Sequence, residues 1–333
     1  MASENFTPGN DNAPRYDGAP GLAEMWYSTM TDRATKAGYW FRLTVEVPKV
    51  GPGTCRIWAA SFRPGEPPLV LRRTYPIGDF SGRDDGLCLP DAELSAGKLA
   101  GEVSSRGRKI AWDLSFDPAP NTYQHLPARI RQSKRSPAVV CSPNLDVVFT
   151  GKVSVDGKEM AVDAPGQQSH RWGKKHPPGW GWAHGCVWEG GAEGIFEGLS
   201  TIVPLGPVRG PKATLLYLRT PEGEGGTSSL VEGLRANCRM EYPRWSFVGT
   251  SGDTRVSGMF VLDPARSVQV RYEDPEGSEA FCVNSEVADG WVAMERREGR
   301  QWKRTARLQA DATAHFELGA RKPYPGVPVA ELD

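Results

Sequence analysis

The sequence predicts an all-β protein of two antiparallel β-barrels packed together, and its alternation, turn content and length each support that prediction. Apolar residues recur at every second position in almost every apolar segment, which is typical of a strand with one buried face. The chain contains 38 glycines and 28 prolines, as expected where many short strands are joined by turns. Its 333 residues exceed the roughly 100–200 residues of a typical domain, so we expect two domains.

The clearest predicted strand is Tyr39–Val47, whose side chains alternate between two faces. One face carries the apolar residues Tyr39, Phe41, Leu43, Val45 and Val47, and the other carries Trp40, Arg42, Thr44 and Glu46. The same pattern predicts further strands at Cys55–Phe62, Leu69–Tyr75, Lys109–Phe116, Asp146–Val155, Gly181–Glu189, Ala213–Leu218, Arg255–Leu262, Ser267–Tyr272, Ala280–Ser285, Gly290–Arg296 and Gln301–Gln309. Such regular spacing indicates a meander that closes into a barrel or a sandwich.

The two halves of the chain resemble each other weakly. Arg108–Pro118 is similar to Arg255–Pro264, and Trp26-Tyr27 has a counterpart in Trp180-Gly181-Trp182. This similarity predicts one barrel in each half of the chain. We therefore expect a disordered tail over residues 1–20, a first barrel over residues 21–175 and a second barrel over residues 176–333.

Charge and cysteine usage narrow the range of partners and location. Forty cationic and 40 anionic side chains balance, so the basic surface of a nucleic-acid-binding protein is not expected. No segment approaches the roughly 20 apolar residues of a membrane-spanning helix, and residues 1–20 lack the features of a signal peptide. The six cysteines are scattered without close pairs. These observations predict a cytoplasmic protein with reduced thiols, a monomer or homodimer without stable membrane insertion.

The most distinctive segment runs from Gln167 to Trp188 and holds three of the five histidines. An extended second half places large side chains on one face, namely Trp180, Trp182, His184, Cys186 and Trp188, and leaves mainly glycine and alanine on the other. Gln168, His170 and Trp172 share a face of the first half. We therefore expect His170 and His184 to face one cavity as catalytic residues, with Gln168, Trp172, Trp180 and Trp182 shaping it. The competing interpretation is that these side chains serve packing and local hydrogen bonds.

Other candidate ligand-binding residues lie elsewhere in the predicted strands. They are Trp40, Arg42, Tyr123 and Asn144. Asp113, His125, Arg235 and Asn284 also lie near strand ends and could point into a cavity, although polar side chains at such positions are more often turn or rim residues.

No metal or cofactor is expected. The ligand types His170, His176, His184 and Cys186 match no short metal-binding pattern. The sequence also lacks a nucleophile elbow, a phosphate-binding P-loop, an HExxH motif and a glycine-rich dinucleotide fingerprint.

Several short motifs resemble those of the two-domain lipocalin-like superfamily. They are Gln168-Ser169-His170-Arg171-Trp172-Gly173 followed by Gly179-Trp180-Gly181-Trp182, together with Glu24-Met25-Trp26-Tyr27 and Tyr272-Glu273-Asp274-Pro275-Glu276-Gly277. This superfamily includes hydroxyneurosporene synthase, AttH-type proteins and lipocalin-like Diels-Alderases. The resemblance implies two lipocalin-like barrels that bind a polyene, terpenoid or polyketide-like molecule.

The activity that this resemblance implies is a cofactor-free cyclisation, isomerisation or hydration, with His170 as proton donor or hydrogen-bonding group. The alternative is a non-catalytic carrier of a lipid or pigment. One departure matters, because many relatives have an acidic residue directly before the motif histidine and this chain has Ser169. An acid-supported His170 is therefore in question.

Overall fold

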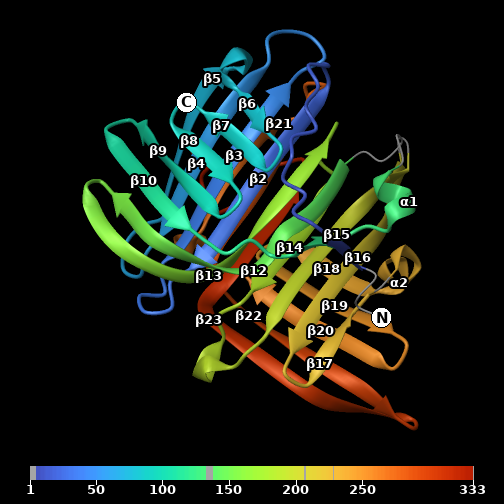
Figure 1. The fold of residues 1–333 in the computed structure, drawn as a ribbon. Helices are drawn as coiled ribbons and strands as arrows, with labels where there is room; N and C mark the ends of the chain where they lie inside the picture. Colours follow the sequence, from blue (N-terminus) through green and yellow to red (C-terminus); the bar gives the residue numbers. More distant parts are fainter. Residues whose placement is uncertain (1–4, 133–137, 206–207, 228, 333) are drawn as a thin grey trace.

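Two curled antiparallel sheets, each a half-barrel, make up the protein in the computed structural model (Figure 1). The structure describes residues 5–132, 138–205, 208–227 and 229–332. The predicted all-β class is confirmed. Its helices are short, namely α1 (Ala128–Arg131), α2 (Leu230–Arg235), η2 (Ile77–Asp79), η3 (Glu189–Gly191) and η4 (Pro264–Arg266). In the described part of the chain, none is long and apolar enough to cross a membrane.

The N-terminal sheet holds 13 strands. They are β1 (Phe6–Pro8), β2 (Leu22–Thr31), β3 (Gly38–Val47), β4 (Thr54–Phe62), β5 (Leu69–Pro76), β6 (Ser81–Arg83), β7 (Gly86–Leu89), β8 (Ala92–Ser95), β9 (Lys98–Ser105), β10 (Arg108–Ser115), β11 (Asn121–Gln124), β12 (Ala138–Val155) and β13 (Lys158–Gly173).

The C-terminal sheet holds ten strands. They are β14 (Gly179–Gly185), β15 (Ile195–Leu205), β16 (Val208–Thr220), β17 (Gly223–Gly226), β18 (Asn237–Glu241), β19 (Arg244–Ser251), β20 (Thr254–Val261), β21 (Val268–Glu273), β22 (Glu279–Glu298) and β23 (Gln301–Ala320). Two segments expected as separate strands, Ala280–Ser285 and Gly290–Arg296, are one long strand, β22, because bulges let it bend without ending.

The two sheets share one strand order. The series β5-β4-β3-β2-β13-β12-β10-β9-β8 matches β17-β16-β15-β14-β23-β22-β20-β19-β18 position by position. The similar segments noted in the sequence lie in β10 and β20, and in β2 and β14, which hold equivalent places. The division between the sheets falls between Gly173 and Gly179.

The three largest apolar clusters of the described residues hold the fold together. Trp26, Phe41 and Trp112 belong to the core of the N-terminal sheet, and Phe196, Trp245 and Phe260 to that of the C-terminal sheet. The third cluster joins the sheets and includes Trp40, Trp58 and Phe62 from one side and Val270 and Tyr272 from the other. β3 is therefore buried on both faces, one against its own core and one against the second sheet.

Residues 5–20 differ from the expected disordered tail. β1 pairs with β11, and Phe6 packs on Tyr217 of the C-terminal sheet with ring centroids 5.5 Å apart. Asn12 is fully buried. The polar composition of this segment reflects hydrogen bonding to the barrel, a contact that its own sequence does not reveal.

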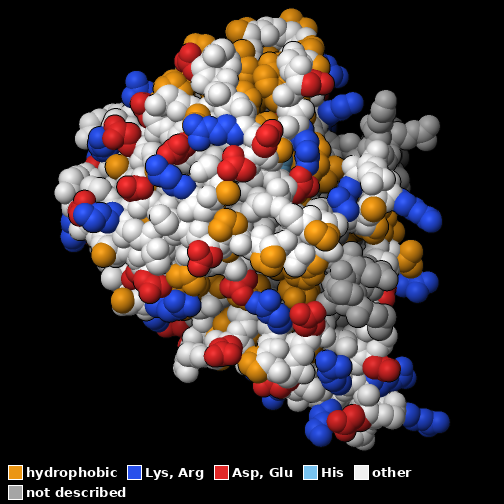
Figure 2. All heavy atoms as spheres, viewed as in Figure 1, with side chains coloured by type: hydrophobic (Ala, Val, Ile, Leu, Met, Phe, Trp, Pro, Cys, Tyr) orange, Lys and Arg blue, Asp and Glu red, His pale blue; other side chains and the backbone are white. Residues whose placement is uncertain are grey.

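Surface charges are interspersed on the face shown in Figure 2. All five histidines are buried. All six cysteines are unpaired, as expected, and four of them are buried.

Candidate functional site

A group of buried polar side chains lies between the two sheets. We call it the interface polar cluster, and it comprises Tyr27, Thr29, Thr31, His125, Gln167, Trp182, His184, Glu197, Asn284, Glu286 and His315. Most occupy inward positions of alternating strands from both sheets. Because buried polar atoms are costly unless they are hydrogen-bonded, their partners decide what the cluster does.

Glu197 is the anionic centre of the cluster. Its Oε1 accepts hydrogen bonds from His125 Nε2 and Trp182 Nε1, both at 2.7 Å, and its Oε2 accepts one from His184 Nδ1 at 3.3 Å. Burial alone would raise the pKa of Glu197, but the hydrogen bonds from the two imidazoles outweigh it and lower the pKa. With Nδ1 directed at Glu197, His184 keeps Nε2 without a hydrogen-bond partner among the described residues.

The pKa of the Glu286 carboxyl group is shifted in the opposite direction to that of Glu197. Its Oε1 accepts hydrogen bonds from Tyr27 Oη and Asn284 Nδ2, both at 3.1 Å, whereas Oε2 has no such partner within the described chain. Burial raises the pKa of Glu286 to about 8, against the lowering effect of the two hydrogen bonds. At neutral pH the carboxyl group is therefore mostly protonated. Because Oε1 already accepts twice, we place the proton on Oε2.

His315 separates these two groups. Its ring nitrogens lie 2.8 Å from Thr29 Oγ1 and 2.8 Å from Thr31 Oγ1. Its ring stacks on that of His184, with centroids 5.5 Å apart, and Glu286 Oε2 lies 3.9 Å from His315 Nε2. Burial and the neighbouring His184 hold the pKa of His315 well below its usual range. A neutral imidazole thus stands between the protonated Glu286 and the His184–Glu197 pair.

Backbone packing brings the two sheets close at this point. A Cβ atom at Gly38 would lie 2.6 Å from the Cβ atom of Glu286. Glycine therefore allows the start of β3 to approach β22 and enclose the carboxyl group.

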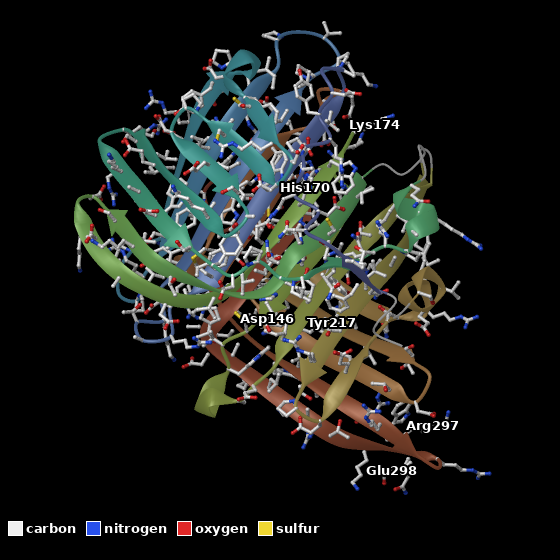
Figure 3. The ribbon with its side chains drawn as sticks, viewed as in Figure 1. Asp146, His170, Lys174, Tyr217, Arg297 and Glu298 are labelled. Carbon is white, nitrogen blue, oxygen red and sulfur yellow. The ribbon has the colours of Figure 1, made fainter. Side chains whose placement is uncertain are left out.

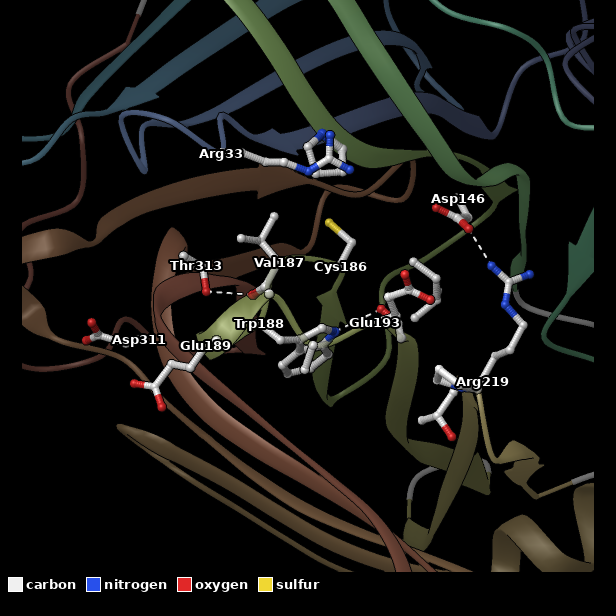
Figure 4. Close-up of a pocket in the computed structure, with 18 of the residues that line it drawn as sticks. Arg33, Asp146, Cys186, Val187, Trp188, Glu189, Glu193, Arg219, Asp311 and Thr313 are labelled. Carbon is white, nitrogen blue, oxygen red and sulfur yellow. Dashed lines mark hydrogen bonds and ion pairs between the residues drawn. The ribbon is translucent and has the colours of Figure 1, made fainter.

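A pocket of about 950 Å³ opens at the junction of the sheets (Figure 4). Its wall includes Pro165 of β13, Ile195 of β15 and Thr313 of β23. Two positions further along each strand, on the same face, come cluster residues, namely Gln167, Glu197 and His315. Two residues of a strand span about 7 Å, so the inner wall of the pocket adjoins the interface polar cluster.

Charged side chains surround the mouth of this pocket. Arg219 pairs with Asp146, and Lys36 Nζ lies 2.9 Å from Asp311 Oδ2. Cys186 also lines the pocket, and burial raises the pKa of its thiol. The mouth is polar, and the route inward leads past aliphatic side chains.

His170 belongs to a different network, which we call the N-terminal anchor and define as Asn10, Asp11, Asn12, Glu24, Asn144, Gln168 and His170. Its Nδ1 donates to the backbone oxygen of Asp11 at 2.7 Å, and its Nε2 lies 2.8 Å from Glu24 Oε1. The ring packs between Trp26 and Trp172, with centroids 4.7 and 4.8 Å away. Figure 3 shows His170 among the strands of the N-terminal sheet.

The side-chain amides of the N-terminal anchor form hydrogen bonds with one another. Asn12 and Gln168 exchange hydrogen bonds of 3.0 and 2.8 Å, and Asn144 Nδ2 donates to Gln168 Oε1 at 2.9 Å. Glu24 accepts the backbone N–H groups of Arg15 and Tyr16. These contacts fasten residues 10–16 onto β2, β12 and β13.

The structure does not bring His170 and His184 into one cavity as expected. Successive side chains of β13 point to opposite faces of the sheet. Gln167 faces the C-terminal sheet, whereas Gln168 and His170 face the N-terminal anchor. The sequence placed His170 correctly on a face with Gln168 and Trp172, but it did not show which face meets the second sheet.

The other expected ligand-binding residues are distributed over three places. Trp182 belongs to the interface polar cluster, and Tyr123 packs against His125 with ring centroids 4.9 Å apart. Trp172 lies under the Arg15 guanidinium at 4.9 Å. Trp180 donates to Glu317 Oε1 at 2.7 Å. Trp40 and Arg42 lie in the third apolar cluster, between the sheets.

Sequence reasoning missed Tyr27, Glu197, Glu286 and His315 as site residues, and for His125 and Asn284 it left open whether they point into a cavity or lie at a rim. The sequence feature that could have identified such residues is a polar side chain among the apolar ones on the buried face of a predicted strand. Glu197 between Phe196 and Leu199 is an example. Asp113 and Arg235, considered with them, are exposed. Over the described residues, no group of three or more His, Cys, Asp or Glu side chains has the geometry of a metal site.

Two curled sheets of equivalent strand order, packed face to face with a pocket at their junction, define the two-domain lipocalin-like fold. Two solved structures share it. An AttH-type protein (NE1406) of Nitrosomonas europaea has a TM-score of 0.54 and 11% identity, covering 93% of this chain and 98% of its own. Kievitone hydratase of Nectria haematococca has a TM-score of 0.50 and 10% identity, covering 95% of this chain and 98% of its own. The similarity at these identities is one of fold.

Sequence comparison finds relatives in Mycobacterium tuberculosis. The uncharacterized proteins MT0513 (strain CDC 1551) and Rv0493c (strain H37Rv) are each 27% identical over 312 residues, which is 92% of this chain and 89% of theirs. No protein-family model matches the chain.

Proposed function

We propose that this protein binds an apolar small molecule of the polyene, terpenoid or polyketide type between its sheets and catalyses its hydration, isomerisation or cyclisation without a cofactor. The observation that carries the proposal is the Oε2 atom of Glu286, which is buried and has no hydrogen-bond partner in the described chain. Burial raises the pKa of this carboxyl group to about 8, which favours its protonated form at neutral pH. A carboxylic acid held in this state is suited to protonate a carbon–carbon double bond.

In the first step Glu286 transfers its Oε2 proton to one alkene carbon. The π electrons form the new C–H bond and leave a cation on the other carbon. The negative charge that develops on Glu286 is stabilised by the hydrogen bonds from Tyr27 and Asn284. Trp182, whose ring lies 5.5 Å from that of Tyr27, provides an aromatic face beside the developing cation.

In hydration, a water oxygen then bonds to the cation and loses a proton to His184 Nε2. Glu197 stabilises the resulting imidazolium through Nδ1, the arrangement in which a carboxylate orients a catalytic histidine. Protons from His184 and to Glu286 exchange with solvent and restore the starting state. Loss of a proton from carbon instead of capture of water gives isomerisation, and attack by a second double bond gives cyclisation.

The comparisons support this proposal at the level of fold, since one protein with this fold is by name a hydratase. The site residues are argued from this chain alone. Relative to the sequence-based hypothesis, the proton donor moves from His170 to Glu286, because both ring nitrogens of His170 are already bonded.

The test compares wild type with Glu286→Gln on a panel of polyenes, terpenoids and prenylated aromatics. Conversion is followed by mass spectrometry and binding by tryptophan fluorescence quenching. We expect turnover to fall by about 10²–10⁴-fold while affinity changes by less than about threefold. Glu24→Gln is the matched control, because Glu24 is a buried, histidine-paired glutamate of the N-terminal anchor, and it should keep its turnover.

Equal turnover by Glu286→Gln and wild type would contradict the assignment of the acid. Tight binding by wild type with no conversion of any compound would instead favour the carrier function that the fold also allows.

A further inference from the structure

Several hydrogen-bond donors in the interface lack partners among the described residues, Arg56 Nε included. Four of them lie close together, namely Trp40 Nε1, Arg42 Nε, Trp58 Nε1 and Arg171 Nη1, and each is a buried atom. All four can only donate. They belong to β3, β4 and β13 and lie on the face of the N-terminal sheet that meets the C-terminal sheet.

Strand register places these donors next to the proposed acid. Arg42 is directly opposite Tyr27 across β2 and β3, and opposite Trp58 across β3 and β4. Directly opposite residues have Cβ atoms about 5 Å apart. Tyr27 in turn donates to Glu286, and its ring lies 5.7 Å from that of Trp40. The unpartnered donors of the N-terminal sheet therefore lie beside Tyr27, which contacts Glu286 of the facing C-terminal sheet.

The charges at these donors are uncompensated. Arg42 is 3% exposed and lies over the rings of Tyr272 and Trp58 at 4.3 and 5.4 Å. Within the described chain neither it nor Arg171 forms an ion pair. Arg56, on the same face, is different because Glu46 and Glu273 pair with it.

The carboxyl groups that face the two arginines are already engaged. Glu317 accepts hydrogen bonds from Trp180 Nε1 and Cys282 Sγ, and burial raises its pKa. Asp274 is held by His176 and Arg321. Arg42 is buried, whereas Arg171 is half-buried and donates from Nη2 to the backbone oxygen of Lys175 at 2.9 Å. Buried positive charge without a paired anion is expensive to maintain, so a function that requires it is expected.

We infer that the ligand of this protein carries a carboxylate head group, bound by Arg42 and Arg171, with its apolar chain running over Trp40 and Trp182 toward Glu286. The inference rests on the proposed function and specifies its substrate class as an amphipathic monocarboxylic acid. A carboxylate fits better than a phosphate, because its two coplanar oxygens match the planar fork of a guanidinium group.

The experiment uses three retinoids that share one polyene chain, namely all-trans-retinoate, all-trans-retinol and retinyl phosphate. Binding is measured by tryptophan quenching. Wild type should bind retinoate at least about tenfold more tightly than the other two. Arg42→Met should weaken retinoate binding by about 10–100-fold and leave retinol binding unchanged. Arg271→Met, which removes an exposed cation from neighbouring β21, should change neither.

The results separate the two proposals. Equal binding of retinoate and retinol, unchanged by Arg42→Met, would overturn the carboxylate site and leave an apolar ligand in place. Tighter binding of retinyl phosphate would overturn the choice of carboxylate. Failure of all three retinoids to bind would count against both the proposed function and the carboxylate site.

A ligand-free measurement supplies an independent test. If Arg42 is retained for binding, Arg42→Met should unfold at the same or a higher temperature than wild type, because it removes an unpaired buried charge. Arg56→Met should unfold at a lower temperature, because it leaves Glu46 without its partner. An equal loss of thermal stability in both variants would show that Arg42 has a structural role and would overturn the inference.

Discussion

Two buried polar networks lie on opposite faces of β13, and both pair a glutamate with a histidine. In the N-terminal anchor, Glu24 meets His170, and the surrounding amides exchange hydrogen bonds among themselves. In the interface polar cluster, Glu197 meets His184, but His184 Nε2 and Glu286 Oε2 remain without partners in the described part of the chain. The chemical groups are the same, and the difference lies in which of their atoms are satisfied.

That difference is a criterion for deciding whether a buried polar network has a structural or a functional role. A network with its key polar atoms bonded gains stability and order from each contact. A network with free atoms loses stability, so its residues need another reason to be there. On this criterion the N-terminal anchor positions residues 10–16, and the interface polar cluster is the part of the molecule that we propose for catalysis.

The largest expected effect is on turnover, and it differs between the alanine variants of His184 and His170. His184→Ala should lower turnover by about 10²–10⁴-fold, because it removes the base that accepts the proton of water. His170→Ala should change turnover by less than about threefold in the folded protein. Steady-state kinetics of both variants, with circular dichroism to verify folding, checks this. A larger loss in His170→Ala would reverse the roles of the networks.

The next effect concerns stability. His170→Ala should lower the free energy of unfolding by about 3 kcal/mol, because it removes the partner of a buried glutamate and a ring packed between two tryptophans. Gln168→Ala should cost about 2 kcal/mol through Asn12 and Asn144. Chemical denaturation measures both. Loss of less than about 0.5 kcal/mol in each variant would contradict a structural role for the N-terminal anchor.

A smaller effect follows from pH. Because the pKa of Glu286 is raised to about 8, the active protonated form is complete at lower pH and is lost as pH rises through that value. Turnover should fall about tenfold per pH unit above about 8. The same shift makes the contribution of Glu286 to folding stability greatest below its ordinary pKa of 4.5 and progressively lost as pH rises to about 8. Glu286→Gln should remove both dependences.

Much of the fold could be predicted from the sequence because strand alternation is local. Tyr39–Val47 was expected as a strand and is part of β3. Glycine and alanine were expected on one face of the segment after Trp180, and in β14 Gly181 lies against Trp245 and Gly185 against Trp188. The weak echo between halves lies in strands of equivalent position.

The site could be predicted only in part because satisfaction of a buried polar atom depends on distant partners. Trp182 and His184 were singled out from their own segment, and both lie in the interface polar cluster. Glu286 required knowing that Tyr27, 259 positions away, binds one oxygen and that nothing described binds the other. The position of His170 in a separate network depends on Asp11 and Glu24, which bond its ring and lie 159 and 146 positions away.

The most direct test of the central claim is the protonation state of Glu286 in the resting protein. Infrared difference spectra of wild type against Glu286→Gln are recorded from about pH 5 to about pH 10. We expect a carbonyl band of a protonated carboxylic acid that is present in wild type at neutral pH, disappears with a midpoint near 8, and is absent from the variant. Absence of this band above about pH 6 would show that Glu286 is an ordinary carboxylate and would contradict its role as the proton donor.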